Sequence, residues 1–153
     1  MATLKISDLS VGDWVGMDLA ELNMPSDDLA TAYIEKLRKP IRIKGISEDS
    51  EMVLADIEEI DGRGSIMLKC EYLKPIPITA EALEKNGFVK NGEYNEWSTG
   101  NWEDIPFIGI SLSRQSMRIK NIGTDIFLEN KVVYVHQLQR ALSLANIDKE
   151  ITL

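Results

Sequence analysis

The stretch YLKPIPITAEALEKNGF, residues 72–88, marks the place where one kind of structure stops and another starts. The residues just before and into it, 65–73, have the alternation of a β-strand. Pro75 and Pro77 then remove two backbone donors and force an extended path. A helix signal follows directly. We therefore expect a junction here between an N-terminal β module, residues 1–78, and a C-terminal α+β module, residues 79–153.

The helix after the prolines carries signals at both ends. Thr79 is a good N-cap, and Gly87 ends the helix because glycine takes the left-handed conformation without steric penalty. Ile78 precedes the cap and Leu83 lies four positions into the helix, which is the spacing of a hydrophobic staple. Phe88 follows the glycine and is expected to fold back on Leu83. These signals predict a short helix at the start of the second module.

The N-terminal module has the pattern of five short strands. We expect strands over residues 14–17, 41–46, 51–60 and 65–73, and a short piece near 75–78. In the fourth strand, alternate residues from Ile66 to Tyr72 face the same side. Residues 61–64, DGRG, form the expected hairpin loop before it. Five short antiparallel strands predict an SH3-like β-barrel, closed enough to avoid long exposed edges.

Residues 18–39 interrupt this β pattern. Ser26 is placed as a helix cap, and two carboxylates follow it in the first turn. Leu29, Tyr33 and Leu37 recur at four-residue intervals, and Pro40 closes the segment. We expect a helix over residues 27–38 as an insertion between the first two strands.

The C-terminal module has the pattern of an antiparallel meander followed by a helix. Three to four strands are expected, over residues 94–98, 107–113, 117–121 and 126–134, with turn residues between them. A helix is expected over residues 135–146, with His136 on its flank. Its buried stripe consists of Val135, Leu138, Leu142 and Ala145. The predicted fold class is therefore α+β.

The composition is that of a globular protein and excludes several kinds of site. The chain has 153 residues, of which 44% are hydrophobic and 27% charged. Cys70 is the only cysteine and His136 the only histidine, which excludes an intramolecular disulfide, a cysteine cluster and a multi-histidine zinc site. No segment has the pattern of a signal peptide or a membrane span, so we expect a cytoplasmic protein without a cofactor and without a membrane partner.

Three segments together resemble a known group of proteins. They are ISDLSVGDWV at residues 6–15, LKPIPITAEALEKNGF at residues 73–88, and VVYVHQLQRALSLANI at residues 132–147. The chain resembles small uncharacterised proteins of Bacteroides-type bacteria and of their prophages and mobile elements. YVHQLQ, residues 134–139, is the most specific match. The chain departs from the pattern through its insertion at 18–39 and through RALS at residues 140–143, where the group has an asparagine and two aromatics. The resemblance implies a phage or mobile-element context and no particular chemistry.

Two groups of residues in the second module are candidates for a binding surface. Tyr94, Trp97 and Trp102 lie near a polar, glycine-bearing loop, and exposed aromatics on loops mark binding surfaces. The alternative is that these rings belong to the core or cover the sheet. Arg114, Arg118 and Lys120 form a basic run that suits a phosphate or nucleic-acid contact. The alternative for this run is a solvated sheet face.

Other conspicuous residues are expected to be structural. His136 could be a general base or a metal ligand, but no second histidine has a supporting spacing, so a role in docking its helix is preferred. The acidic pairs lack the spacing of calcium or two-metal sites. The expected structural residues are Trp14, Tyr72, Leu83, Phe88, Tyr134, His136, Leu138 and Leu142.

The functional hypothesis is a non-enzymatic protein that binds another protein, or a second copy of itself as a homodimer. No Walker loop, dinucleotide turn or GxSxG motif occurs in the chain. A nucleic-acid-associated module is the second hypothesis, although the net charge of −8 repels polyanions. An acidic inhibitor or mimic of a host factor is the third. An enzyme is the class we least expect.

Overall fold

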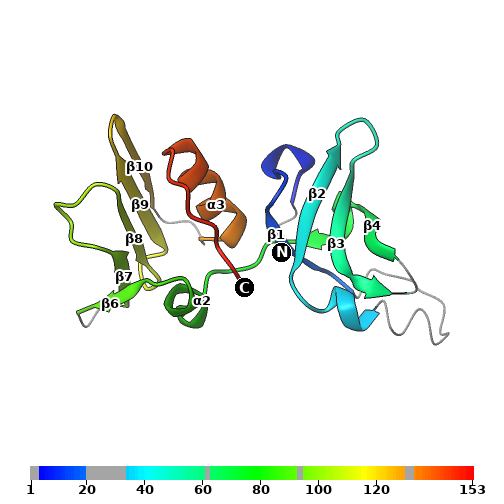
Figure 1. Cartoon of the computed structure of the whole chain (residues 1–153), viewed down its shortest axis with the longest axis horizontal. Coiled ribbons are helices and arrows are strands. Elements are labelled where there is room, and N and C mark those ends of the chain that lie inside the picture. Colours follow the sequence, from blue (N-terminus) through cyan, green and yellow to red (C-terminus); the bar gives the residue numbers. More distant parts are fainter. Residues whose placement is uncertain (1–3, 20–33, 61–62, 93–94, 130–132) are drawn as a thin grey trace. The chain divides into compact units, whose positions relative to one another are not determined.

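The computed structural model describes residues 4–19, 34–60, 63–92, 95–129 and 133–153. Within these ranges the chain is a mixed α+β protein with ten strands in two antiparallel, five-stranded sheets (Figure 1). It divides into two compact units, Met1–Ile76 and Pro77–Leu153. The boundary falls inside the proline segment, where two missing backbone donors prevent a sheet from continuing.

The first unit contains one curled sheet with the strand order β4-β3-β2-β1-β5 (Figure 1). Its strands are β1 (Trp14–Met17), β2 (Ile41–Ser47), β3 (Met52–Ile60), β4 (Arg63–Lys69) and β5 (Leu73–Lys74). A short 3₁₀ helix, η1 (Ile6–Asp8), precedes β1, and a second one, η2 (Cys70–Tyr72), separates β4 from β5. The core of this unit includes one buried side chain from each of β1 to β4, namely Val15, Ile43, Val53 and Leu68.

The end of β4 corrects a sequence-based expectation. The alternation from Ile66 to Tyr72 predicted one strand over 65–73, but the strand ends at Lys69 and the chain turns through η2. The turn is required because β5 must pair with the distant β1, with Leu73 opposite Met17. The expected short strand at 75–78 is also wrong, since β5 ends at Lys74. Alternation cannot distinguish a strand from a strand followed by a tight turn that buries Cys70.

Trp14 and Tyr72, two of the expected structural residues, lie in the first unit, and the insertion is described in part. Trp14 is half-buried beneath the Arg42 guanidinium, 5.9 Å from the ring centroid, and Tyr72 packs against the core. Residues 34–37 are helical, and Leu37 is buried in the core. The first part of the helix expected over 27–38 lies outside the described residues.

The second unit is a simple antiparallel meander with the strand order β10-β9-β8-β7-β6. Its strands are β6 (Val89–Asn91), β7 (Glu96–Thr99), β8 (Phe107–Ser111), β9 (Ser116–Asn121) and β10 (Thr124–Leu128). The sequence missed β6, because three exposed residues carry no alternation. The strand expected over 126–134 is shorter and begins earlier, since Thr124 pairs with Asn121 directly across a two-residue turn.

The junction helix, α2 (Ala80–Lys85), confirms the predicted caps. The Thr79 hydroxyl accepts a hydrogen bond from the Ala82 N–H at 3.2 Å. Gly87 has a φ of +78°, and the Phe88 N–H donates to the Leu83 carbonyl at 3.0 Å. Ile78, Leu83 and Phe88 are all buried. The helix therefore ends in a Schellman-type turn, and both residues of the expected hydrophobic contact are buried.

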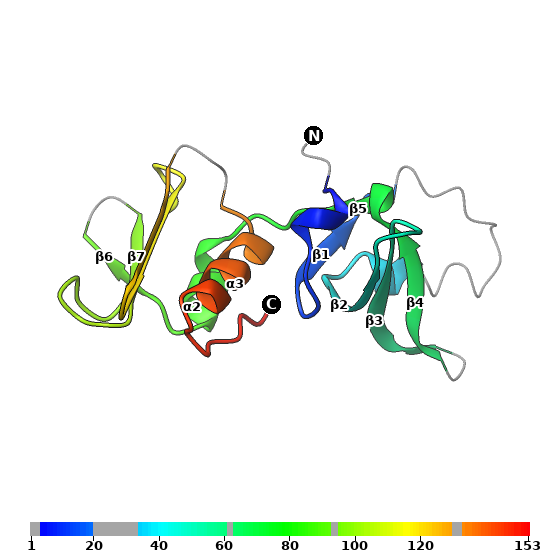
Figure 2. The same cartoon turned by 90° about the horizontal axis from the view of Figure 1, so that it is seen from above.

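The last helix, α3 (Val135–Leu144), lies with α2 on one face of the second sheet (Figures 1 and 2). The predicted stripe of Val135, Leu138, Leu142 and Ala145 is fully buried. Tyr134 is the N-cap, and its ring stacks on His136 with centroids 5.8 Å apart. His136 is only 5% exposed, so its place is in the packing of α3.

Loss of the Thr79 cap should destabilise the second unit measurably. We expect Thr79→Ala to lower its free energy of unfolding by about 1 kcal/mol, because one orphan N–H of α2 loses its acceptor. Thr79→Ser keeps a hydroxyl at the cap and should retain most of this stability. Urea unfolding followed by circular dichroism measures both variants. Equal losses in the two would show that the hydroxyl is not what matters.

Candidate functional site

The register of the second sheet separates its residues into two faces. Directly opposed residues in antiparallel strands share a face. Ile110 and Met117 lie on the face that the helices cover. The opposite face is called the open face here, because none of the described helices of this unit lies over it (Figure 2). It consists of Val89, Asn91, Glu96, Ser98, Phe107, Gly109, Ser111, Ser116, Arg118, Lys120, Asp125 and Phe127.

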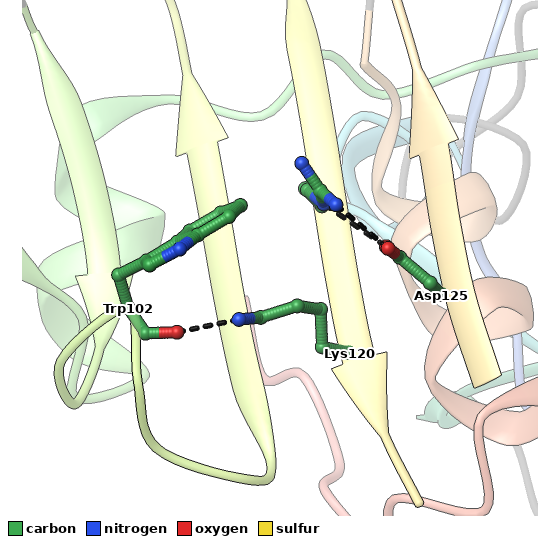
Figure 3. A network of polar contacts seen from close by, with 4 residues as sticks. Trp102, Lys120 and Asp125 are labelled. Atoms are coloured by element: carbon green, nitrogen blue, oxygen red, sulfur yellow. Dashed lines mark hydrogen bonds and ion pairs between the residues drawn. The ribbon is translucent and has the colours of Figure 1, made fainter. Parts of the chain in front are cut away.

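Trp102 lies over the open face and contacts two of its cations. The Lys120 ammonium lies 3.9 Å from the centroid of the Trp102 ring, and the Arg118 guanidinium lies 4.5 Å from it. Lys120 also donates a hydrogen bond to the Trp102 carbonyl oxygen (Figure 3). The edge of Phe107 meets the same ring at a centroid distance of 5.2 Å. The indole is therefore held in place even though 52% of the residue is exposed.

The loop between β7 and β8 has a defined conformation that presents Trp102. Gly100 has a φ of +78°, which favours glycine. The Asp104 carboxylate accepts a hydrogen bond from the Asn101 N–H at 2.6 Å, and the Ser98 hydroxyl donates to the Gly100 carbonyl at 3.1 Å. These short-range bonds are the turn chemistry expected of glycine, asparagine and aspartate in a loop.

Arg118 and Asp125 form a bidentate ion pair across β9 and β10. The distances are 2.9 Å from Nε to Oδ1 and 2.7 Å from the second guanidinium nitrogen to Oδ2. This hydrogen bonding lowers the pKa of the Asp125 carboxyl and raises the pKa of the Arg118 guanidinium. Both groups are exposed, so their main effect is to fix the plane of the guanidinium between the Trp102 and Phe127 rings.

A cavity of about 270 Å³ lies on the open face and is called the trough here. Gly109 lines its floor, and the Phe107 ring leans over this glycine. A Cβ atom at Gly109 would come within 2.9 Å of the Phe107 ring, so the ring can take this position only because residue 109 is a glycine. Trp102 and Phe127 form parts of the wall, and Arg114 lies at the end near the β8–β9 turn.

Four of the six predicted surface residues meet at this site. Trp102, Arg118 and Lys120 stack together, and Arg114 lines the trough. The placement of Trp97 on this surface is wrong. Its side chain is 4% exposed and lies on the helix-covered face, because it pairs with Ile110. Tyr94 lies outside the described residues.

Sequence reasoning missed Asp125 and Phe127 as members of the site. Both lie on β10, where they alternate with Ile126 on the opposite face. Phe127 is 55% exposed, and the Arg118 guanidinium carbon lies 6.0 Å from the centroid of its ring. The alternation in TDIFL was the available signal, but the face assignment needs the register with β9.

The first unit has a second cavity, of about 400 Å³, whose lining includes Trp14, Lys39 and Arg42. Its aromatic ring is half-buried, whereas the Trp102 ring stands exposed. The open face therefore offers a partner more accessible aromatic surface, and we treat it as the candidate site.

The ion pair between Arg118 and Asp125 predicts a pH effect. Because the folded-state pKa of Asp125 is depressed, the pair stabilises the fold above the unfolded-state pKa. This contribution is lost as the pH falls through the folded-state pKa. A carboxyl-carbon NMR titration should place the pKa of Asp125 below the ordinary value of about 3.9. Arg118→Gln should return it towards that value, whereas the control Arg114→Gln should not.

Among the described residues, no group of three or more histidine, cysteine, aspartate or glutamate side chains could hold a metal ion. No described helix has both the length and the apolar character required to cross a bilayer. Comparison of the chain with protein-family models, with curated proteins and with solved structures finds no match.

Proposed function

We propose that the chain is a non-enzymatic binding protein that acts by protein–protein contact through the open face of its second sheet. One observation carries this proposal: two exposed aromatic residues flank an arginine that is fixed by a bidentate ion pair. Trp102 is 52% exposed and Phe127 is 55% exposed, and the Arg118 guanidinium contacts both rings. Tryptophan and arginine are the residues most enriched at the energetic centres of protein interfaces.

Preorganisation supports the same function. Binding normally costs free energy because it immobilises side chains that are mobile in the free protein. Here Lys120 holds the Trp102 main chain, and Asp125 holds the Arg118 guanidinium. A partner therefore meets side chains that are already ordered, so less conformational entropy is lost on binding.

We further propose that the first unit is an SH3-like barrel. Support comes from its strand order, in which β5 pairs with β1 and the remaining strands follow in sequence. The η2 turn before β5 and the long connection between β1 and β2 also suit such a barrel. The proposed context is a cytoplasmic phage or mobile-element protein, and it rests on the sequence resemblance. A second copy of the chain is among the protein partners that this surface could bind.

Removing the indole should abolish partner binding. With the tagged chain as bait in an extract of the cells that encode it, we expect Trp102→Ala to reduce capture of a specific protein by 10-fold or more, as at an interface hot spot. Ile122→Ala is the matched control, because Ile122 is 88% exposed in the β9–β10 turn and lies outside the open face. Circular dichroism verifies that both variants fold. Undiminished capture by Trp102→Ala would contradict the proposal.

Nucleic acid is the second candidate partner, because Lys120 and Arg118 both lie against the Trp102 ring on a sheet surface. The net charge of −8 opposes it. We therefore expect no binding of a single-stranded oligonucleotide in fluorescence anisotropy at physiological ionic strength. Saturable binding that weakens with salt and disappears in the Arg118→Glu, Lys120→Glu double variant would make nucleic acid the partner instead.

A further inference from the structure

We propose that the trough receives a single tyrosine side chain from an acidic peptide segment of the partner protein. This inference rests on the protein-binding function proposed above and specifies which chemistry the open face recognises. It uses the shape of the trough, the nature of its walls and two polar groups at one of its ends.

The size of the trough suits one side chain. Its volume of about 270 Å³ is smaller than the roughly 300–1,000 Å³ of sites that enclose drug-sized ligands. Its floor is Gly109, opposite Arg118 in the neighbouring strand, with the Phe107 ring leaning over the glycine. A flat group at the floor of the trough would therefore lie against the Phe107 ring.

The walls favour an aromatic ring over an aliphatic group. Trp102 and Phe107 already meet edge to face, with an interplanar angle of 74°, and Phe127 lies on the strand beyond Arg118. Aromatic rings gain from edge-to-face and offset contacts beyond the area that they bury. Because the Arg118 guanidinium already lies between Trp102 and Phe127, an incoming ring would make such contacts against the exposed sides of these rings.

The end of the trough beside the β8–β9 turn favours a hydroxyl on that ring. The Ser98 hydroxyl is engaged with Asn91 and Gly100, and the Ser111 hydroxyl accepts from the Arg114 N–H at 3.3 Å. The Ser116 hydroxyl forms no hydrogen bond within the described part of the chain. A phenol at this position would exchange a hydrogen bond with Ser116 and complete its bonding.

The charge at the same end favours a carboxylate next to the tyrosine. The guanidinium of Arg114 has no ion-pair partner among the described residues, whereas that of Arg118 is satisfied by Asp125. Glu96 also lines the trough, on β7 opposite Ser111, so it repels acids from that side. The acidic residue of the partner should therefore approach over the β8–β9 turn, where Arg114 is the complementary charge.

The test uses the intact ¹⁵N-labelled chain and the capped pentapeptide Asp-Glu-Tyr-Glu-Asp as the probe. We expect saturable NMR shifts at Gly109, Arg114, Ser116 and the Trp102 indole. Replacing the tyrosine of the probe by phenylalanine should weaken binding about 2- to 10-fold, the effect of one lost hydrogen bond, and replacing it by alanine should abolish binding. Arg114→Glu should weaken binding of the unmodified probe.

A variant whose side chain fills the trough tests the inference most directly. Ser116→Phe should abolish probe binding, whereas Ser143→Phe, on the exposed side of α3, should bind like the natural chain. Equal binding of the tyrosine and alanine probes, shifts that map elsewhere, or no saturable shift would each overturn the inference. Protein capture that is lost in Trp102→Ala but kept in Ser116→Phe would reject the tyrosine trough and leave the proposed function standing. Capture that is unaffected by both would reject the proposed function itself.

Discussion

The alternation of side chains along β8 and β9 is the constraint on which the candidate site depends. Ile108, Ile110, Met117 and Ile119 bury one face of the sheet beneath α2 and α3. Because a strand has a period of two, the residues between them must lie on the other face. Phe107, Gly109, Arg118 and Lys120 are therefore collected on the open face by the same pattern that builds the core. A one-residue slip in the pairing of these strands would bury the charges and destroy both the core and the open face.

The contacts on the open face are individually weak, but together they hold its side chains in fixed orientations. Exposed ion pairs and cation–π contacts stabilise a fold little. Here they fix the orientation of groups that would otherwise move: Asp125 orients Arg118, and Lys120 anchors the Trp102 loop. Such ordering matters for recognition more than for stability, since a partner then binds a surface with its side chains already in place.

The helices of the second unit depend on bonds from distant parts of the chain as well as on their own caps. The Asn86 side chain binds the Thr152 main chain through both its amide and its carbonyl groups, at 2.8 and 2.9 Å. The Asn121 amide donates to the Ala145 carbonyl at the end of α3. Pro77 and Tyr134 form an isolated bridge that ties the entry of α2 to the entry of α3. The Asn121 bond supplies a donor to a carbonyl at the end of α3, where the helix itself offers none.

Local signals were sufficient for the elements whose bonds close within a few residues. The cap at Thr79, the turn at Gly87 and the buried stripe of α3 follow from contacts three or four positions apart, which is why the sequence predicts them correctly. The end of β4, the short β5 and the burial of Trp97 could not be predicted, because each depends on which distant strand becomes the neighbour. The site belongs to this second class. Trp102 and Lys120 stand 18 positions apart, and only the pairing of β8 with β9 and the closure of the intervening loop bring them into contact.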